Sequence, residues 1–117
     1  MQDYRKLKVW QKAHAFVLKA YAVSTYLKAP EAWPLRDQLL RALISVPSNI
    51  AEGAGRGTDP DFGRFLKPSL GSINEVEYDL LLARDLGFLP AHEHSRLSAH
   101  LEEVRRMLCG LIASVNT

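Results

Sequence analysis

The sequence predicts an all-α fold, an up-down-up-down four-helix bundle with a kinked second helix, formed by one domain over residues 1–117. Apolar residues recur every three or four positions in four segments, which is the helical period. Proline and glycine separate these segments, and none alternates with the period of two that strands require. With 117 residues, 47% of them hydrophobic, the chain can bury one core and is not a disordered tail.

The first helical segment is predicted over residues 4–28. Its apolar row contains Trp10, Ala13, Val17, Ala20, Ser24 and Leu27, and Phe16 and Tyr21 widen that face. Trp10 is therefore expected in the core. Residues 29–34 include Pro30 and Pro34, and two prolines so close together predict a connector rather than a helix.

The second segment is predicted to begin near Pro34, because proline suits the first helical turn. Its apolar row contains Leu35, Leu39, Leu43, Val46 and Ile50. Gly53, Gly55 and Gly57 predict its end, since glycine readily adopts the left-handed cap conformation. Pro47 lies inside this segment and removes one backbone hydrogen bond, so we expect a kink there.

The third segment opens with Asp59 as the expected cap, Pro60 at the first helical position and Asp61 near the positive helix end. Its apolar row contains Phe62, Phe65, Leu66, Ser69, Ile73, Val76, Leu80 and Ala83. Pro68 predicts a bend, and Gly87 predicts the end.

The fourth segment follows Pro90. Its seam contains Leu97, Leu101, Val104, Leu108, Leu111 and Val115, which alternate steps of four and three as in coiled coils. Cys109 follows Leu108 in this seam and is expected to be a small buried thiol.

Polar residues form a stripe along the second segment, and one face of the third carries a similar row that includes Glu75. The stripe contains Gln38, Arg41, Ser45, Asn49, Glu52 and Arg56. Arg41 and Arg56 are spaced to bracket Glu52 and Glu75 with bidentate hydrogen bonds. Three interpretations compete: a solvated face, a satisfied network between helices or subunits, and a ligand or catalytic site in which both glutamates act as acid and base.

Several motifs occur in an order that is similar to a known family over residues 4–89. They lie at residues 7–13, 35–38, 41–42, 45–53, 55–56, 65–66, 71–75 and 86–89. The most specific block reads Ser-Val-Pro-Ser-Asn-Ile-Ala-Glu-Gly, at residues 45–53. The chain resembles the 23S rRNA intervening-sequence proteins, whose fold includes the accessory variability proteins of diversity-generating retroelements. Ala54 and Pro68 depart from the residues usual in that family.

This resemblance implies a small bacterial cytoplasmic bundle that assembles as a ring-shaped homo-oligomer, with five copies expected, and it implies no enzymatic activity. It assigns Gln38, Arg41, Asn49, Glu52, Arg56 and Glu75 to contacts within the bundle or the ring. The network interpretation of the stripe, which also contains Ser45, is therefore favoured. Retroelement relatives bind RNA and a reverse transcriptase through basic surfaces, so RNA or an RNA-handling protein is an expected partner.

Positive charge is concentrated at the start of the chain: residues 1–28 carry a net +5 and the remainder −3, for a total of +2. We expect RNA phosphates to be contacted by Arg5, Lys6, Lys8, Lys12 and Lys19, with Arg105 and Arg106 as further candidates. The alternative is an ordinary solvated helix face, which would leave an adaptor ring that binds protein and no nucleic acid.

Motifs for metals and cofactors are weak. His92 and His94 are two residues apart and do not share a helix face, so no metal or other cofactor is expected. The glycines at residues 53–57 lack the preceding strand and the lysine of a phosphate loop. No apolar run approaches the ~18 residues of a membrane span, and one cysteine cannot form an intrachain disulfide, so we expect a cytoplasmic protein without membrane association.

Overall fold

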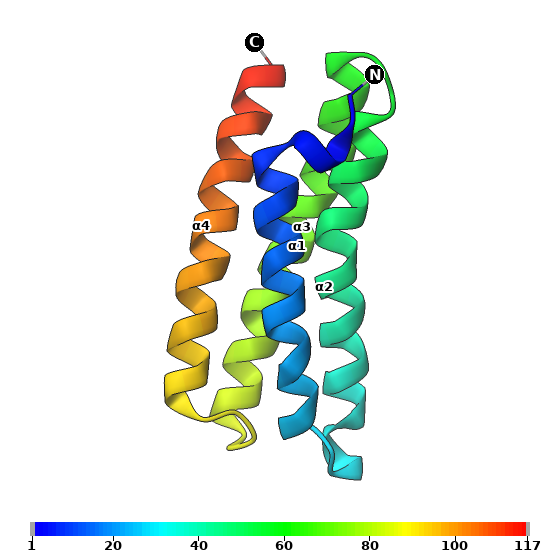
Figure 1. Cartoon of the computed structure of the whole chain (residues 1–117). Coiled ribbons are helices and arrows are strands. Elements are labelled where there is room, and N and C mark those ends of the chain that lie inside the picture. The colour runs from blue at the N-terminus through cyan, green and yellow to red at the C-terminus, as the bar shows by residue number, and fades with distance from the viewer. Residues whose placement is uncertain (1, 117) are drawn as a thin grey trace.

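In the computed structural model, which describes residues 2–116, four antiparallel α-helices pack as an elongated bundle of 44 × 22 × 20 Å (Figure 1). The helices are α1 (Lys8–Tyr21), α2 (Trp33–Ala54), α3 (Asp59–Asp85) and α4 (Ala91–Val115). Helix α1 contacts α2 and α4, and α3 contacts the same two helices, so α1 and α3 are diagonal neighbours. The predicted all-α, up-down-up-down bundle is confirmed.

Each helix sends buried apolar side chains to a core along the bundle axis, among them Phe16, Leu43, Leu80 and Leu108. Burying one such side chain contributes roughly 1.5–3 kcal/mol. The seam predicted for α4 is buried at Leu97, Leu101, Val104 and Leu108, whereas Leu111 and Val115 are half-buried. Trp10 packs against the core but is also only half-buried.

The first segment contains less α-helix than the periodicity predicts. Two short 3₁₀ helices, η1 (Tyr4–Lys6) and η2 (Ala22–Tyr26), flank α1. Before α1, Asp3 accepts a hydrogen bond from the Arg5 backbone N–H at 3.0 Å and caps η1. After α1, the Thr25 hydroxyl donates to the Ala22 carbonyl at 2.8 Å, a local bond that competes with the helix. The apolar row continues to the buried Leu27 because the 3₁₀ turns still face the core.

Both internal prolines lie within uninterrupted helices. Helix α2 begins at Trp33, with Pro34 in its first turn as predicted, and continues through the buried Pro47. Helix α3 likewise continues through Pro68, which is exposed. Each proline lacks the N–H that a helix normally uses, yet both segments remain helical. The bends expected at Pro47 and Pro68 stay predictions.

Two helix ends differ from prediction and a third agrees with it. Gly53 lies inside α2, which ends at Ala54, while Gly57 adopts a φ of 88° in the turn beyond it. Thr58, not Asp59, caps α3, because its hydroxyl accepts from the Asp61 N–H. The predicted stop of α3 at Gly87 is confirmed by a φ of 85°, a conformation that glycine adopts without strain.

The prediction of a buried thiol in α4 is wrong, because Cys109 is exposed. The reason lies in the rotation of α4 about its axis. Leu108 occupies the inward position, and a helix turns by about 100° at the next residue. The sulfur of Cys109 therefore faces outward.

Candidate functional site

Polar side chains line the contact between α2 and α3. The hydroxyls of Ser45 and Ser72 lie 2.8 Å apart, and Asn49 Nδ2 donates to the Ser45 carbonyl at 2.9 Å and hydroxyl at 3.0 Å. The buried Ser69 hydroxyl donates to the Val46 carbonyl at 2.8 Å. We call this group the polar seam: Gln38, Ser45, Asn49, Ser69, Ser72 and Asp79. Its hydroxyls and amides have partners, so desolvation is compensated.

At the end of α2 the two helices approach closely. A Cβ added to Gly53 would lie 2.9 Å from Phe62 Cδ1 and 2.9 Å from Phe65 Cβ, so only glycine fits without displacement. The guanidinium of Arg56 lies 4.6 Å from the Phe65 ring centroid and donates to Glu52 Oε1 at 3.0 Å. The Arg56–Glu52 pair lies at the surface, where solvent keeps such a contact weak.

Asp79 is the exception in the polar seam. Its side chain is 0% exposed, and its Oδ1 accepts from Gln38 Nε2 at 2.8 Å. Its Oδ2 is buried without a hydrogen-bond partner in residues 2–116. Burial raises the pKa of Asp79, the Gln38 hydrogen bond opposes the rise, and the nearby Glu75 adds to it.

Only some residues of the predicted stripe contact one another. The structure pairs Ser45 with Asn49, and Glu52 with Arg56. Arg41 and Glu75 are exposed, and neither has a polar partner in the part of the chain that the structure describes. Gln38 contacts Asp79 of α3 instead.

Ser69, Ser72 and Asp79 are polar-seam residues that the sequence analysis did not assign to the network. The available signal was their spacing, because these positions share one face of α3. Ser69 was placed correctly on the buried face of α3.

Glu52 and Glu75, the pair proposed for acid–base chemistry, are held apart by the antiparallel register. Ser45 faces Ser72 across the helix contact. From there Glu52 lies further along α2 and Glu75 further along α3, which point in opposite directions. At 1.5 Å per residue their separation along the bundle is about 15 Å. The two carboxylates cannot act on the same bond at that distance.

An apolar surface runs between α1 and α2. The Trp10 and His14 rings stack with centroids 4.9 Å apart and planes 7° apart, and Tyr4 meets the Trp10 edge. We call this surface the α1–α2 apolar face: Trp10, His14, Val17, Ile44 and Pro47 line its hollow, and Leu18 and Tyr21 lie one turn after His14 and Val17 on α1. Leu18 is 65% exposed and Ile44 49%, and a hollow of about 300 Å³ lies between the helices. No acidic, lysine or arginine side chain lines that hollow.

Two of the lysines expected to bind RNA face α4 instead. Lys12 Nζ lies 2.9 Å from Glu103 Oε1, and this contact lowers the pKa of Glu103. Lys19 Nζ lies 3.4 Å from His100 Nε2. The charge of Lys12 is therefore offset within the chain.

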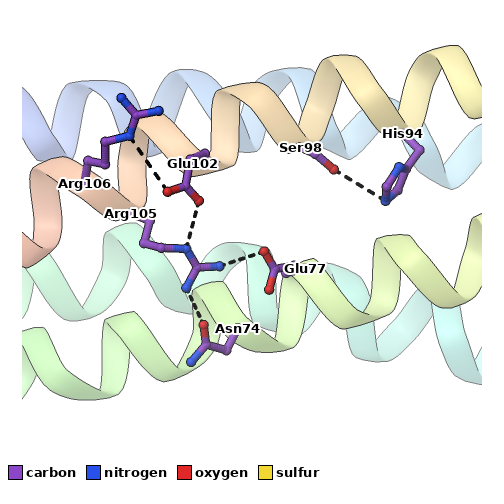
Figure 2. A network of polar contacts seen from close by, with 7 residues as sticks. All are labelled: Asn74, Glu77, His94, Ser98, Glu102, Arg105 and Arg106. Carbon is purple, nitrogen blue, oxygen red and sulfur yellow. Dashed lines mark hydrogen bonds and ion pairs between the residues drawn. The ribbon is translucent and has the colours of Figure 1, made fainter.

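Arg105 joins α4 to α3 (Figure 2). It lies 3.0 Å from Glu77 and 3.2 Å from Glu102, and also donates to Asn74. Arg106 lies 3.8 Å from the other oxygen of Glu102. Arg105 thus turns toward α3 rather than toward the lysines of α1, an orientation that the sequence did not predict. Nearer the start of α4, the Ser98 hydroxyl lies 3.4 Å from His94 Nε2.

Unpaired positive charge remains at the beginning of the chain. Lys6 and Lys8 are exposed and have no ionic partner within residues 2–116. Arg5 pairs with Asp3 at 3.2 Å and lowers the pKa of that carboxyl, although the Arg5 side chain is largely exposed. We call Arg5, Lys6 and Lys8 the basic end.

Over residues 2–116, no three or more histidine, cysteine or acidic side chains cluster as a metal site would require. None of the helices in that range has the length and apolarity needed to cross a bilayer.

The model of the 23S rRNA-intervening sequence protein family matches residues 5–110. A crystal structure of a protein with unknown function from the S23 ribosomal protein family of Bacteroides thetaiotaomicron has the same fold, with a TM-score of 0.82 and 23% sequence identity. The match covers 89% of this chain and 97% of that chain. The search of curated proteins found no significant match.

Proposed function

Because the chain belongs to the 23S rRNA-intervening sequence protein family, we propose that it is a non-enzymatic scaffold whose copies assemble through the α1–α2 apolar face. The observation that carries this proposal is the exposure of Leu18 and Ile44 beside the stacked Trp10 and His14 rings. Soluble monomers rarely leave a large contiguous apolar patch in water, so burial against another copy supplies a driving force. The family resemblance leads us to propose a cytoplasmic homo-oligomeric ring of five copies.

Replacing Ile44 by glutamate tests this assembly. A carboxylate buried in an interface without a partner costs several kcal/mol, so Ile44→Glu should convert the oligomer to a monomer while leaving the helix content unchanged. Leu86→Glu is the matched control, because Leu86 is 57% exposed at the end of α3, outside the face. Gel filtration with light scattering measures the mass, and circular dichroism measures the helix content. A monomeric wild type, or an unaltered Ile44→Glu oligomer, would contradict the proposal.

A second function, contact with RNA or an RNA-handling protein, is favoured by the basic end. Lys6 and Lys8 have no carboxylate to displace before they meet a phosphate, and Arg5 has only an exposed pair. Neutralising phosphates releases counterions, which drives binding without base recognition. In an assembled ring, several copies would present the same basic end, so weak single contacts would combine.

A further inference from the structure

One arginine differs from all the others in the chain. Each arginine except Arg41 lies within salt-bridge distance of an aspartate or glutamate. Arg41 is exposed on the outward ridge of α2, together with Asp37, Ile44 and Ser48. That ridge points away from the α2–α3 contact, which accounts for the absence of an in-chain partner among the described residues.

An uncompensated acidic group lies on the neighbouring helix. Glu75 is exposed without a partner in the described chain, and Asp79, one turn later on α3, is fully buried with its Oδ2 unsatisfied. Gln38 covers Asp79 from α2 through a neutral amide, which supplies one hydrogen bond and no positive charge. We call Glu75, Asp79 and Gln38 the acidic cluster.

We propose that the acidic cluster binds the Arg41 guanidinium of a second copy of this chain. The proposal rests on self-assembly as proposed above and adds a polar contact at the edge of the α1–α2 apolar face, because Arg41 lies one turn before Ile44 on α2. A guanidinium offers several donors in a planar fork, so it can bind the Glu75 carboxylate through two hydrogen bonds. Its charge would also compensate Asp79, which is fully buried, where electrostatic attraction is screened less than in water.

Charge reversal in separate copies distinguishes this contact from one within a chain. Arg41→Glu alone and Glu75→Arg alone should each raise the dissociation constant of the oligomer by about tenfold or more, because each sets like charges together. In an equal mixture, glutamate at position 41 of one variant meets arginine at position 75 of the other, and the reverse contact also matches. Two variants cannot alternate completely around a ring of five copies, so at most four of the five contacts match. Mixing should therefore recover most of the lost affinity, with heteromers exceeding homomers.

Native mass spectrometry separates the two variants by mass and counts the copies of each in every oligomer. Arg84→Glu is the control, since it reverses an exposed arginine that already pairs with Asp85 on the same helix end. Unchanged assembly of either single variant, or a mixture no better than its components, overturns the Arg41 contact while leaving the apolar-face assembly intact. A wild type that is monomeric in the same spectrometer overturns both proposals.

Discussion

Asp79 shows at the scale of one residue how packing overrides the preference of a side chain for water. Helix α3 places it on the same face as Ser72, where α2 covers it completely. One oxygen has a single amide partner and the other has none within the described residues. A buried carboxylate in these surroundings resists ionisation, because removing its charge from water is costly.

The raised pKa of Asp79 predicts a specific pH dependence. The folded state retains this proton to higher pH than the unfolded state, so its stabilising effect is present at low pH and is lost as pH rises through the folded-state pKa. Asparagine does not titrate. The free energy of unfolding of wild type, relative to that of Asp79→Asn, should therefore increase as pH falls from about 7.5 to about 4, by about 1.4 kcal/mol for each unit of pKa shift.

Urea unfolding at protein concentrations low enough to keep both chains monomeric measures this difference. Taking the difference removes the contributions of carboxylates whose pKa is lowered, such as Glu93 beside Arg96 and Glu103 beside Lys12. Those carboxylates lower the free energy of unfolding as pH falls, because protonating them weakens ion pairs of the folded state. A difference that does not change with pH would show that burial does not perturb Asp79.

At the scale of the helices, the close approach of α2 and α3 depends on small side chains along the contact. Gly53 meets two phenylalanines, and the Ser45 and Ser72 hydroxyls lie 2.8 Å apart. The Ser69 hydroxyl reaches a backbone carbonyl of the other helix. These groups replace bulky apolar packing by short polar contacts, and they set the register in which α2 and α3 can meet.

Gly53→Ala should destabilise the protein by about 1–3 kcal/mol, because the added methyl group collides with Phe62 and Phe65. This loss exceeds the gain of up to about 1 kcal/mol that alanine brings to a helix interior. Gly110→Ala in α4 is the matched control, since open space surrounds Gly110 and the substitution should stabilise by roughly 0.5–1 kcal/mol. Chemical denaturation compares the two; similar effects at both glycines would mean that α2 and α3 are not in close contact.

For the whole molecule, the distribution of charge matters more than its total. The bundle carries a net charge of only +2. Acidic side chains pair with Lys12 of α1 and with the three arginines of α4. Lys6 and Lys8 retain their charges at one end of the molecule, close to Arg5. A polyanion that binds at that end would not have to displace an acidic side chain from either lysine.

Lys6→Glu combined with Lys8→Glu should weaken binding of a mixed-sequence single-stranded RNA, and wild-type binding should weaken as salt rises, because fewer counterions are then released favourably. Lys28→Glu combined with Lys67→Glu is the control: both are exposed lysines without an ion pair among the described residues, outside the basic end. Fluorescence anisotropy at several salt concentrations measures the affinity. Equal losses in the two double variants would indicate nonspecific attraction, and intact binding of a protein partner by the first would favour an adaptor without RNA.

Local features of the chain were sufficient to predict the four helices and several of their ends. The start at Pro34 and the stop at Gly87 depend on backbone preferences of single residues. The buried face of α4 follows from spacing alone, because the helical period is a property of the chain itself. The extent of α1 was overestimated, since a 3₁₀ turn can keep an apolar residue facing inward after the α-helix has ended.

Which polar groups meet one another depended on features that no single segment contains. Spacing placed Arg41 and Glu52 in one stripe, and both are exposed. Only Glu52 has a partner within residues 2–116, namely Arg56 one turn later on α2. Arg105 of α4 contacts Glu77 of α3, and Asp79 is covered because α2 packs over it. A helix pattern specifies a face, whereas a contact also requires the register and rotation of the neighbouring helix, which arise only when the whole bundle packs together.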